Sequence, residues 1–419
     1  MATATTSSNE VELNSPELLR QVNALRKMDN VTNWFYIARE YLFLVLVIAL
    51  TIAFYHYRAA WELSWLWNVP VTFVAIVLIG AGQHRLTNIG HEASHYMLFH
   101  NRVLNELASD WLAMFPVWSS THHYRLQHLA HHQFPNDPER DPDVTQMTAS
   151  GHRYRFPMPR PRFLWECILK PFLWVPSLIR YIRVRAKYAS TGSGKGPYGV
   201  KREASKLLIG VGLAYLGVLA GLVTAFTHWE MPWLLSLVPA AMLTGILAFY
   251  ALLPERFYPL TALKPDIAPR WRAMMRVTYL SLLFSALGWL SYRTDKPWGL
   301  YYLVLWLVPL GTTFAFFMLL RQIVQHGNAD QERLTNTRIF NVHPFIRFAV
   351  FPWGMNYHLP HHLFPMVPHF RLRRLHDLLT QSEEYRRQAT VVDGYFLHKE
   401  IPPQHPNVLD LMAGEKIAN

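Results

Sequence analysis

The chain has 419 residues, of which 51% are hydrophobic and only 16% are charged. Soluble domains carry about a quarter charged residues, so this apolar composition excludes a disordered chain or a collagen. The single cysteine, Cys167, excludes an internal disulfide and a cysteine-based metal cluster. The formal net charge of +12 accompanies long apolar runs, which indicates cytoplasmic loops and anionic lipid headgroups rather than nucleic acid.

The N-terminal residues are polar and contain no charged segment followed by an apolar core. We therefore expect a tail or surface helix there and no cleavable signal peptide. The patterning predicts three parts of the chain: a polar N-terminal tail over 1–35, a membrane domain over 36–380 and a C-terminal cytoplasmic tail over 381–419.

Apolar runs then follow in pairs, and each approaches or reaches the roughly 17–25 residues that a spanning helix needs. The mean hydropathy of +0.06 fits about six such spans. The shortest run, 277–292, is also compatible with an interfacial helix. The predicted spans are 41–57, 65–82, 207–228, 231–253, 277–292 and 298–320.

The charges of the connecting loops predict the topology. The turns inside each pair are short and nearly neutral, whereas the long stretches 83–206 and 254–276 are rich in Arg and Lys. Within the first stretch, we expect the basic segment 179–187 to face solvent or lipid headgroups, and 190–199 to be a flexible Gly/Ser-rich link. The sequence thus predicts an all-α integral membrane protein with six helices in three hairpins, and with both termini and a histidine-rich cap in the cytoplasm.

Three groups of closely spaced histidines stand out in the polar stretches. They are HEASH at 91–95, HLAHH at 128–132 and HLPHH at 358–362. Within a helix, positions i, i+3 and i+4 share one face, so each group directs two or three imidazoles toward one point. Pro360 lies in the third group and favours a turn or a helix start there. All three groups fall on the predicted cytoplasmic side, where they can converge.

The number of grouped histidines indicates the kind of metal site. Eight exceed the three protein ligands of a catalytic zinc ion and the four of a structural one. Imidazole suits iron, copper, nickel and zinc, and the lack of thiolate ligands disfavours Cu(I) and iron–sulfur clusters. His326 follows the last apolar run as a further candidate, and Gln322 one turn earlier could add an oxygen or a water-bridged contact. The pattern predicts two metal ions with open positions that bind and reduce O₂.

Several neighbouring side chains are candidates for positioning these imidazoles. Ligating histidines usually donate their other ring N–H to a carboxylate or a carbonyl. Each candidate carboxylate either orients a histidine in this way or simply belongs to a solvated loop that is ordered by prolines. Glu92 points off the ligand face, and two tryptophans near the boxes either cover a substrate tunnel or anchor the interface. The candidates are His84, Glu92, Trp118, His122, His123, Asp137, Asp141, Asp330 and Trp353.

In this order and spacing, HEASH, HLAHH and HLPHH resemble the three histidine boxes of the membrane-bound fatty acid desaturase superfamily, over about residues 40–380. The third box continues as HHLFPMVPHFRLRRLH, which is similar to acyl-lipid desaturases. The resemblance implies a di-iron centre, O₂ as co-substrate and an external supply of two electrons. His326 is similar to an additional ligand near the third box of some members. The iron ligands implied by the resemblance are His91, His95, His128, His131, His132, His326, His358, His361 and His362.

Two departures from relatives with a fused electron donor are visible. The third box starts with His358 where front-end desaturases have Gln, and no HPGG haem motif occurs in this sequence. We therefore expect a separate donor, a ferredoxin or a cytochrome b5, acting with a membrane lipid or acyl substrate.

The sequence thus predicts an O₂-dependent di-iron fatty acid (acyl-lipid) desaturase that inserts a double bond into a long acyl chain. A lipid hydroxylase or monooxygenase with a sphingolipid- or carotenoid-type substrate is the first alternative, because the boxes do not distinguish the two outcomes. Two further alternatives fit the sequence less well. A membrane zinc hydrolase would need only about three histidine ligands. A metal-binding transporter would place polar residues inside the spans, and the predicted spans are almost free of them.

Overall fold

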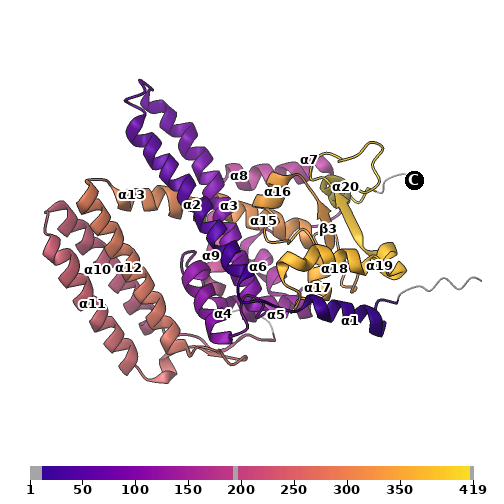
Figure 1. Ribbon diagram of the computed structural model, residues 1–419, viewed down its shortest axis with the longest axis horizontal. Helices are drawn as coiled ribbons and strands as arrows, with labels where there is room; N and C mark the ends of the chain where they lie inside the picture. Colours follow the sequence, from indigo (N-terminus) through magenta and orange to yellow (C-terminus); the bar gives the residue numbers. More distant parts are fainter. Residues whose placement is uncertain (1–11, 192–196, 416–419) are drawn as a thin grey trace, which may run out of the picture.

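The computed structural model describes residues 12–191 and 197–415 and is built almost entirely of helices (Figure 1). Six helical segments are long and apolar enough to cross a membrane, and each coincides with a predicted span. They are α2 (Thr32–Tyr57), α3 (Asn68–Ser94, entered through Trp65–Trp67), α10 (Lys206–His228), α11 (Pro232–Leu252), α12 (Pro269–Thr294) and the composite segment Trp298–His326.

The fifth segment is longer than its apolar run. The sequence predicts 277–292, whereas α12 begins at Pro269, because Pro fits the first turn of a helix, and continues for 26 residues. Arg272 and Arg276, which the charge pattern assigns to a loop, are therefore helical residues. Their side chains reach toward residues of the stretch 106–118.

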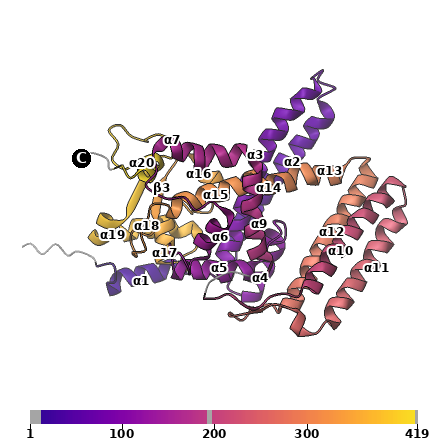
Figure 2. The ribbon, with the colours of Figure 1, turned by 180° about the vertical axis from the view of Figure 1, so that it is seen from behind.

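The helices α10, α11 and α12 pack on one another as a three-helix group at one end of the molecule (Figures 1 and 2). Gly288 permits the close contact of α12 with α10, since a Cβ there would lie 2.3 Å from Val223 Cγ1. The sixth segment instead packs against α3. The predicted third hairpin, 277–292 with 298–320, is therefore not confirmed, because the two helices are neighbours mainly at the turn that joins them.

The sixth segment is broken into α13 (Trp298–Tyr302), a π-helical turn (Leu303–Leu307), α14 (Val308–Gly311) and α15 (Thr313–His326). The helix α3 is the central element of the larger body, because it contacts α2, α5 and α15. A Cβ at Gly80 of α3 would lie 2.1 Å from Thr313 Oγ1, so glycine is required where α3 crosses α15. This crossing brings the ends of both helices, with their histidines, to the same place.

Shorter helices surround these ends. They are α1 (Pro16–Leu25), α4 (Arg102–Ser109), α5 (Thr121–Gln133), α6 (Pro142–Ser150), α7 (Arg160–Phe163), α8 (Lys170–Leu173), α9 (Val175–Thr191), α16 (Pro344–Ala349), α17 (His358–Leu363), α18 (Leu372–Leu379), α19 (Glu383–Gln388) and α20 (Val408–Ala413). π-Helical turns follow α4 (Asp110–Met114) and α7 (Leu164–Leu169), and 3₁₀ turns occur at Glu255–Phe257 and His369–Arg371.

Two small sheets complete the fold. The strand β1 (Val200–Arg202) pairs antiparallel with β2 (Leu260–Thr261), and β3 (Arg338–Asn341) pairs in parallel with β4 (Thr390–Asp393). The first sheet immediately follows the predicted link 190–199, of which 192–196 lie outside the described residues.

Both predicted tails contribute to the packed body where they are described. Leu18 and Val22 of α1 are buried, and α1 contacts α18. Beyond residue 380, Tyr385 and Val392 belong to the same buried cluster as Phe340 of β3. The boundaries at 35 and 380 remain predictions, but the described residues beyond them are folded against the core.

Candidate metal centre

Four helices carry the histidines of the candidate site. The first box ends α3, the second lies in α5, the third forms α17, and His326 ends α15. Ser120 caps α5, with its Oγ accepting from the His123 amide. Helix α17 starts at His358, so Pro360 lies in its first turn, where proline is tolerated. The predicted helix start at the third box is thereby confirmed.

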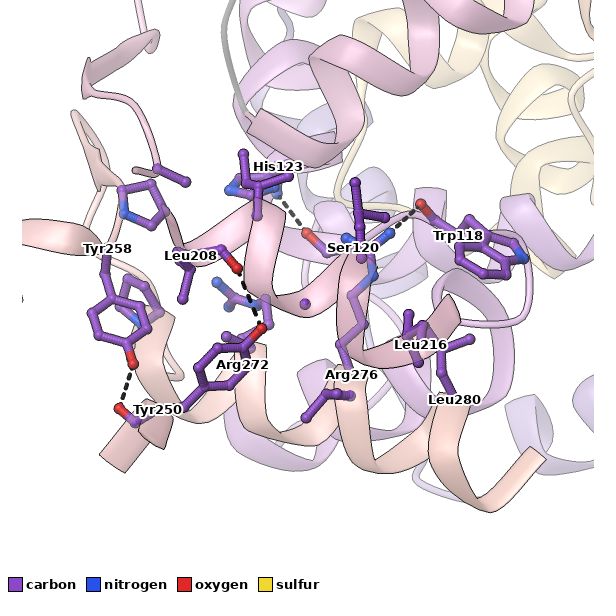
Figure 3. Close-up of a pocket in the computed structure, with 18 residues that line it drawn as sticks. Trp118, Ser120, His123, Leu208, Leu216, Tyr250, Tyr258, Arg272, Arg276 and Leu280 are labelled. Atoms are coloured by element: carbon purple, nitrogen blue, oxygen red, sulfur yellow. Dashed lines mark hydrogen bonds between the residues drawn. The ribbon is translucent and has the colours of Figure 1, made fainter. Parts of the chain in front are cut away.

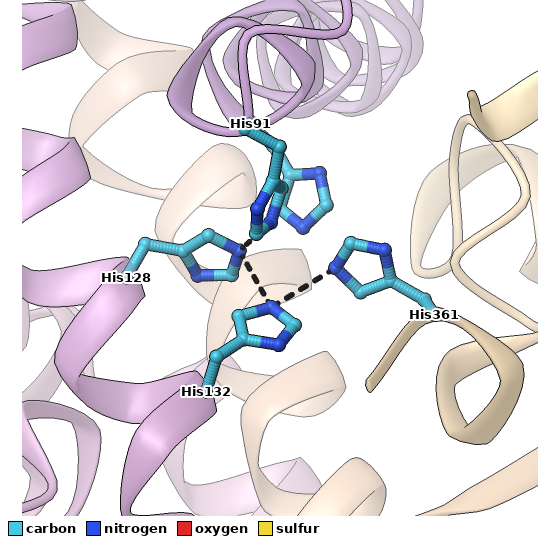
Figure 4. A group of neighbouring side chains, drawn as sticks. His91, His128, His132 and His361 are labelled. Atoms are coloured by element: carbon cyan, nitrogen blue, oxygen red, sulfur yellow. Dashed lines mark hydrogen bonds between the residues drawn. The ribbon is translucent and has the colours of Figure 1, made fainter. Parts of the chain in front are cut away.

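The first histidine group is formed by five side chains from three helices: His91, His95, His128, His132 and His361. One nitrogen of each lies within 4.8 Å of the corresponding nitrogens of the others. Figure 4 shows the rings turned toward a common centre. The Nε2 atoms of His95 and His128 are 2.9 Å apart, and those of His128 and His132 are 3.1 Å apart.

The second histidine group contains His131, His326, His358 and His362, again within 4.8 Å. The Nε2 atom of His358 is 3.0 Å from that of His326 and 3.2 Å from that of His362. The rings of His132 and His362 stack with centroids 4.2 Å apart, which places the two groups side by side. All nine histidines implied by the resemblance are thus together, although the second and third boxes are each divided between the groups.

The geometry fits cations at both centres. Two nitrogens bound at right angles to an ion about 2.1 Å away lie about 3.0 Å apart, close to the observed ring separations. Both ring nitrogens of His91 are buried without a hydrogen-bond partner among the described residues. Burial lowers the pKa of His95 to about 3 and keeps the pKa of His128, His132 and His361 well below its ordinary value. These neutral imidazoles offer lone pairs to a metal.

Two ligand candidates are oriented through their second nitrogen, as metal-binding histidines usually are. His131 Nδ1 lies 3.0 Å from both carboxylate oxygens of Asp141. Although burial opposes it, this carboxylate raises the pKa of His131 to about 9. The Nδ1 atom of His326 lies 3.0 Å from the carbonyl oxygen of Asn336. Each contact leaves Nε2 directed to the second histidine group.

The remaining candidate carboxylates have different partners in the structure, and none of them belongs to either histidine group. Asp137 accepts hydrogen bonds from two backbone amides of its own loop and pairs with Arg140, so it orders the loop. Asp330 accepts from Thr335 Oγ1 and does not orient His326. The Glu92 carboxylate is 3.7 Å from His91 Nδ1 and accepts from the His369 amide at 3.1 Å. As predicted, Glu92 lies beside the imidazoles and outside both groups.

The additional histidines lie outside both groups of described ligand candidates. His84 Nδ1 is 2.8 Å from the Ala349 carbonyl oxygen, and His122 Nε2 is 3.0 Å from Thr261 Oγ1. His123 lines the apolar pocket described below. The two hydrogen-bonding contacts favour positional roles for His84 and His122.

The two tryptophans have different surroundings. Trp353 is buried, donates to Glu40 Oε1 at 3.2 Å and stacks on His369 with centroids 4.2 Å apart. The alternative of interface anchoring is therefore wrong for Trp353. Trp118 lines a pocket of about 300 Å³ between α10, α12 and the start of α5. Figure 3 shows leucines around this pocket, with Arg276 joined to the Trp118 carbonyl oxygen.

Sequence reasoning missed the polar side chains beside the metal centre. It predicts Arg185 in a solvated basic segment, but Arg185 donates to Gln322 at 3.1 Å and pairs with Asp143 at 3.5 Å. The Gln322 oxygen is therefore used by Arg185 and Tyr181. Arg321, in the same helix as His326, was also overlooked. The predicted span 298–320 ends one residue before Arg321, so the pattern of charges in the spans gave no signal for it.

Comparison with known proteins agrees with this architecture. The family model described as "Fatty acid desaturase" matches residues 71–259 and 249–391, which is more than half of the chain. Together with the six helices of spanning length and the imidazoles that could hold metal, this match supports a metal-binding membrane oxidoreductase. The chain belongs to the fatty acid desaturase family.

Two curated relatives are desaturases. "Dihydrorhizobitoxine desaturase" of Bradyrhizobium elkanii is 25% identical over 405 residues, covering 94% of this chain and 88% of the relative. "Delta 8-(E)-sphingolipid desaturase" of Emericella nidulans is 31% identical over 83 residues, covering 20% of this chain and 15% of the relative. The substrate named for the first relative is not a fatty acid, so family membership leaves the substrate of this chain open.

Proposed function

We propose that this protein is an O₂-dependent di-iron desaturase that introduces a double bond into an acyl chain. The observation that carries the proposal is the pair of adjacent, buried histidine groups, which contain five and four side chains. Such a site suits two redox-active ions with open positions better than one zinc ion. The proposed ligands are the nine histidines of these two groups.

When bound, two iron ions would supply O₂ reduction and the oxidising power to remove hydrogen from an unactivated C–H bond. The reaction balances as one CH₂–CH₂ unit, O₂, two electrons and two protons giving one CH=CH unit and two waters. The protein holds the imidazoles in place through Asp141 and the Asn336 carbonyl, and buries the site away from bulk water. We propose that a separate ferredoxin or cytochrome b5 supplies the electrons.

Three features support a long acyl substrate. The protein has six apolar helices of spanning length, its family is named for fatty acids, and an apolar pocket borders helix α5, which carries the second box. In this proposal the protein is a multi-pass membrane protein whose histidine-rich cap and termini face the cytoplasm. The cationic long loops favour that orientation.

The test is mass spectrometry of lipids and metabolites from cells expressing the protein, with elemental analysis of the purified protein. A product about 2 Da lighter than its precursor, formed by protein with about two irons, is the expected result. A product about 16 Da heavier would replace the desaturase with a hydroxylase at the same site. Zinc alone, without an oxidised product, would overturn the proposal.

A further inference from the structure

A cavity of about 40 Å³ lies against imidazoles of both histidine groups, and much of its remaining wall is polar. That volume accommodates a water molecule or one carboxylate-sized group, and it is too small for an acyl chain. A pocket for the middle of an alkyl chain would have mainly apolar walls. Besides the histidines, the polar lining comprises Tyr124, Gln127, Asp143, Arg185, Arg321, Gln322 and Gln325.

Arg321 gives this cavity a cation without a matching carboxylate. It lies in the apolar segment Trp298–His326, and its Nη1 donates to Asn88 Oδ1 at 3.1 Å. The nearest acid in the lining, Asp143, forms its ion pair with Arg185 at 3.5 Å. Among the described residues, Arg321 forms no ion pair. A cation that is held inside a protein without a carboxylate partner is costly, so an arginine in this state is a candidate for binding an anion.

Gln127 provides an unpartnered amide atom in the lining. Its side-chain amide is hydrogen-bonded to that of Gln146, with Gln146 Nε2 3.0 Å from Gln127 Oε1. Its Nε2 is buried and has no hydrogen-bond partner in the described part of the chain. Buried polar groups are nearly always paired. The cavity therefore presents one charged donor, Arg321, and one unpaired amide atom of Gln127 to whatever occupies it.

We infer that this cavity binds a carboxylate of the substrate, with Arg321 as the charged donor. Arginine binds carboxylates through two parallel hydrogen bonds, which fixes direction as well as position. This inference rests on the proposed function and narrows it. The substrate is a free carboxylic acid rather than an esterified lipid, and the double bond forms a few bonds from its carboxylate.

Hexanoate and 1-hexanol are suitable probes, because they share a chain length and differ in charge. Their affinities for the purified, iron-loaded full chain in phosphatidylcholine nanodiscs are measured by calorimetry. We expect hexanoate to bind about tenfold tighter or more than hexanol. Arg321→Gln should remove this preference, Arg321→Lys should keep part of it, and the exposed Arg183→Gln on α9 should leave it unchanged.

Iron content and thermal unfolding of each variant establish that the fold and metal site persist. Equal binding of hexanoate and hexanol by the wild type would overturn the inference. So would hexanoate binding that survives Arg321→Gln and is lost in His361→Ala, because the carboxylate would then be bound at the histidines. Since the readout is binding, a protein that lacks desaturated products would contradict the proposed function separately.

Discussion

At the scale of single residues, the nine imidazoles differ in how they are fixed. His131 and His326 each use one ring nitrogen for an oxygen of the protein. His358 and His361 instead have buried Nδ1 atoms without partners among the described residues. Ring orientation in α17 therefore depends on backbone geometry and on the metal itself. Substitutions should affect the two kinds of ligand differently.

Replacing His361 by Ala removes a proposed ligand from the first histidine group, where its Nε2 lies 3.1 Å from that of His132. We expect turnover to be lost and iron content to fall from about two toward about one per chain. Membrane insertion should persist, because the apolar helices are unchanged. Elemental analysis and product assays measure both effects. The exposed His228→Ala is the matched control, and full activity of His361→Ala would contradict the ligand assignment.

Asp141→Asn keeps the size of the side chain and removes the charge that orients His131. Loss of such a partner lowers metal affinity or activity by about 10- to 100-fold. Iron affinity is measured by competition with a chelator. Asp137→Asn serves as the control, since Asp137 contacts its own loop and Arg140. Equal iron affinity in the two variants would exclude the orienting role of Asp141.

At the scale of elements, the crossing of α3 and α15 determines where their terminal histidines meet. Gly80 is the point of closest approach, because an added Cβ would also lie 2.7 Å from the Phe314 amide nitrogen. The same crossing is supported by Thr313 Oγ1, which donates to the Ile76 carbonyl at 2.6 Å. Separation of these helices would move His91 away from His326 without altering either side chain.

We expect Gly80→Ala to destabilise the protein by about 1–3 kcal/mol through overpacking and to lower its iron content. Gly245→Ala, on α11 with open space around the new methyl group, should be neutral or stabilise by up to about 1 kcal/mol. Thermal unfolding in detergent compares the two. Equal midpoints would show that the α3–α15 contact tolerates a methyl group.

At the scale of the whole molecule, six crossings would place both ends of the chain on one side of the membrane. Turns between paired helices, at Glu62, Glu230 and Asp295, would lie on the other side. We expect cysteines at these exposed positions to react with an impermeant maleimide in intact cells, and Gln404→Cys to remain unlabelled. The native Cys167 is buried. Labelling of Gln404→Cys together with Glu62→Cys would contradict an even number of crossings.

The sequence by itself determined the helical class, the six apolar segments and the histidine boxes, because helical periodicity and apolar run length are local properties. It also indicated Asp141, since a carboxylate near a box is a local signal. The tertiary structure decided what depends on contacts between distant segments. Arg185 belongs to a polar cavity rather than to solvent, and α12 packs with α10 and α11 rather than with the sixth segment.

The division of the second and third boxes between two histidine groups was likewise a tertiary result. Neighbouring positions in α5, His131 and His132, point to different centres because successive helical residues are rotated by about 100°. Which partner each ring meets then depends on α15 and α17, which begin 180 or more residues after the end of α5. Spacing fixes the directions of side chains along one helix, whereas only packing fixes where helices from distant parts of the chain bring them together.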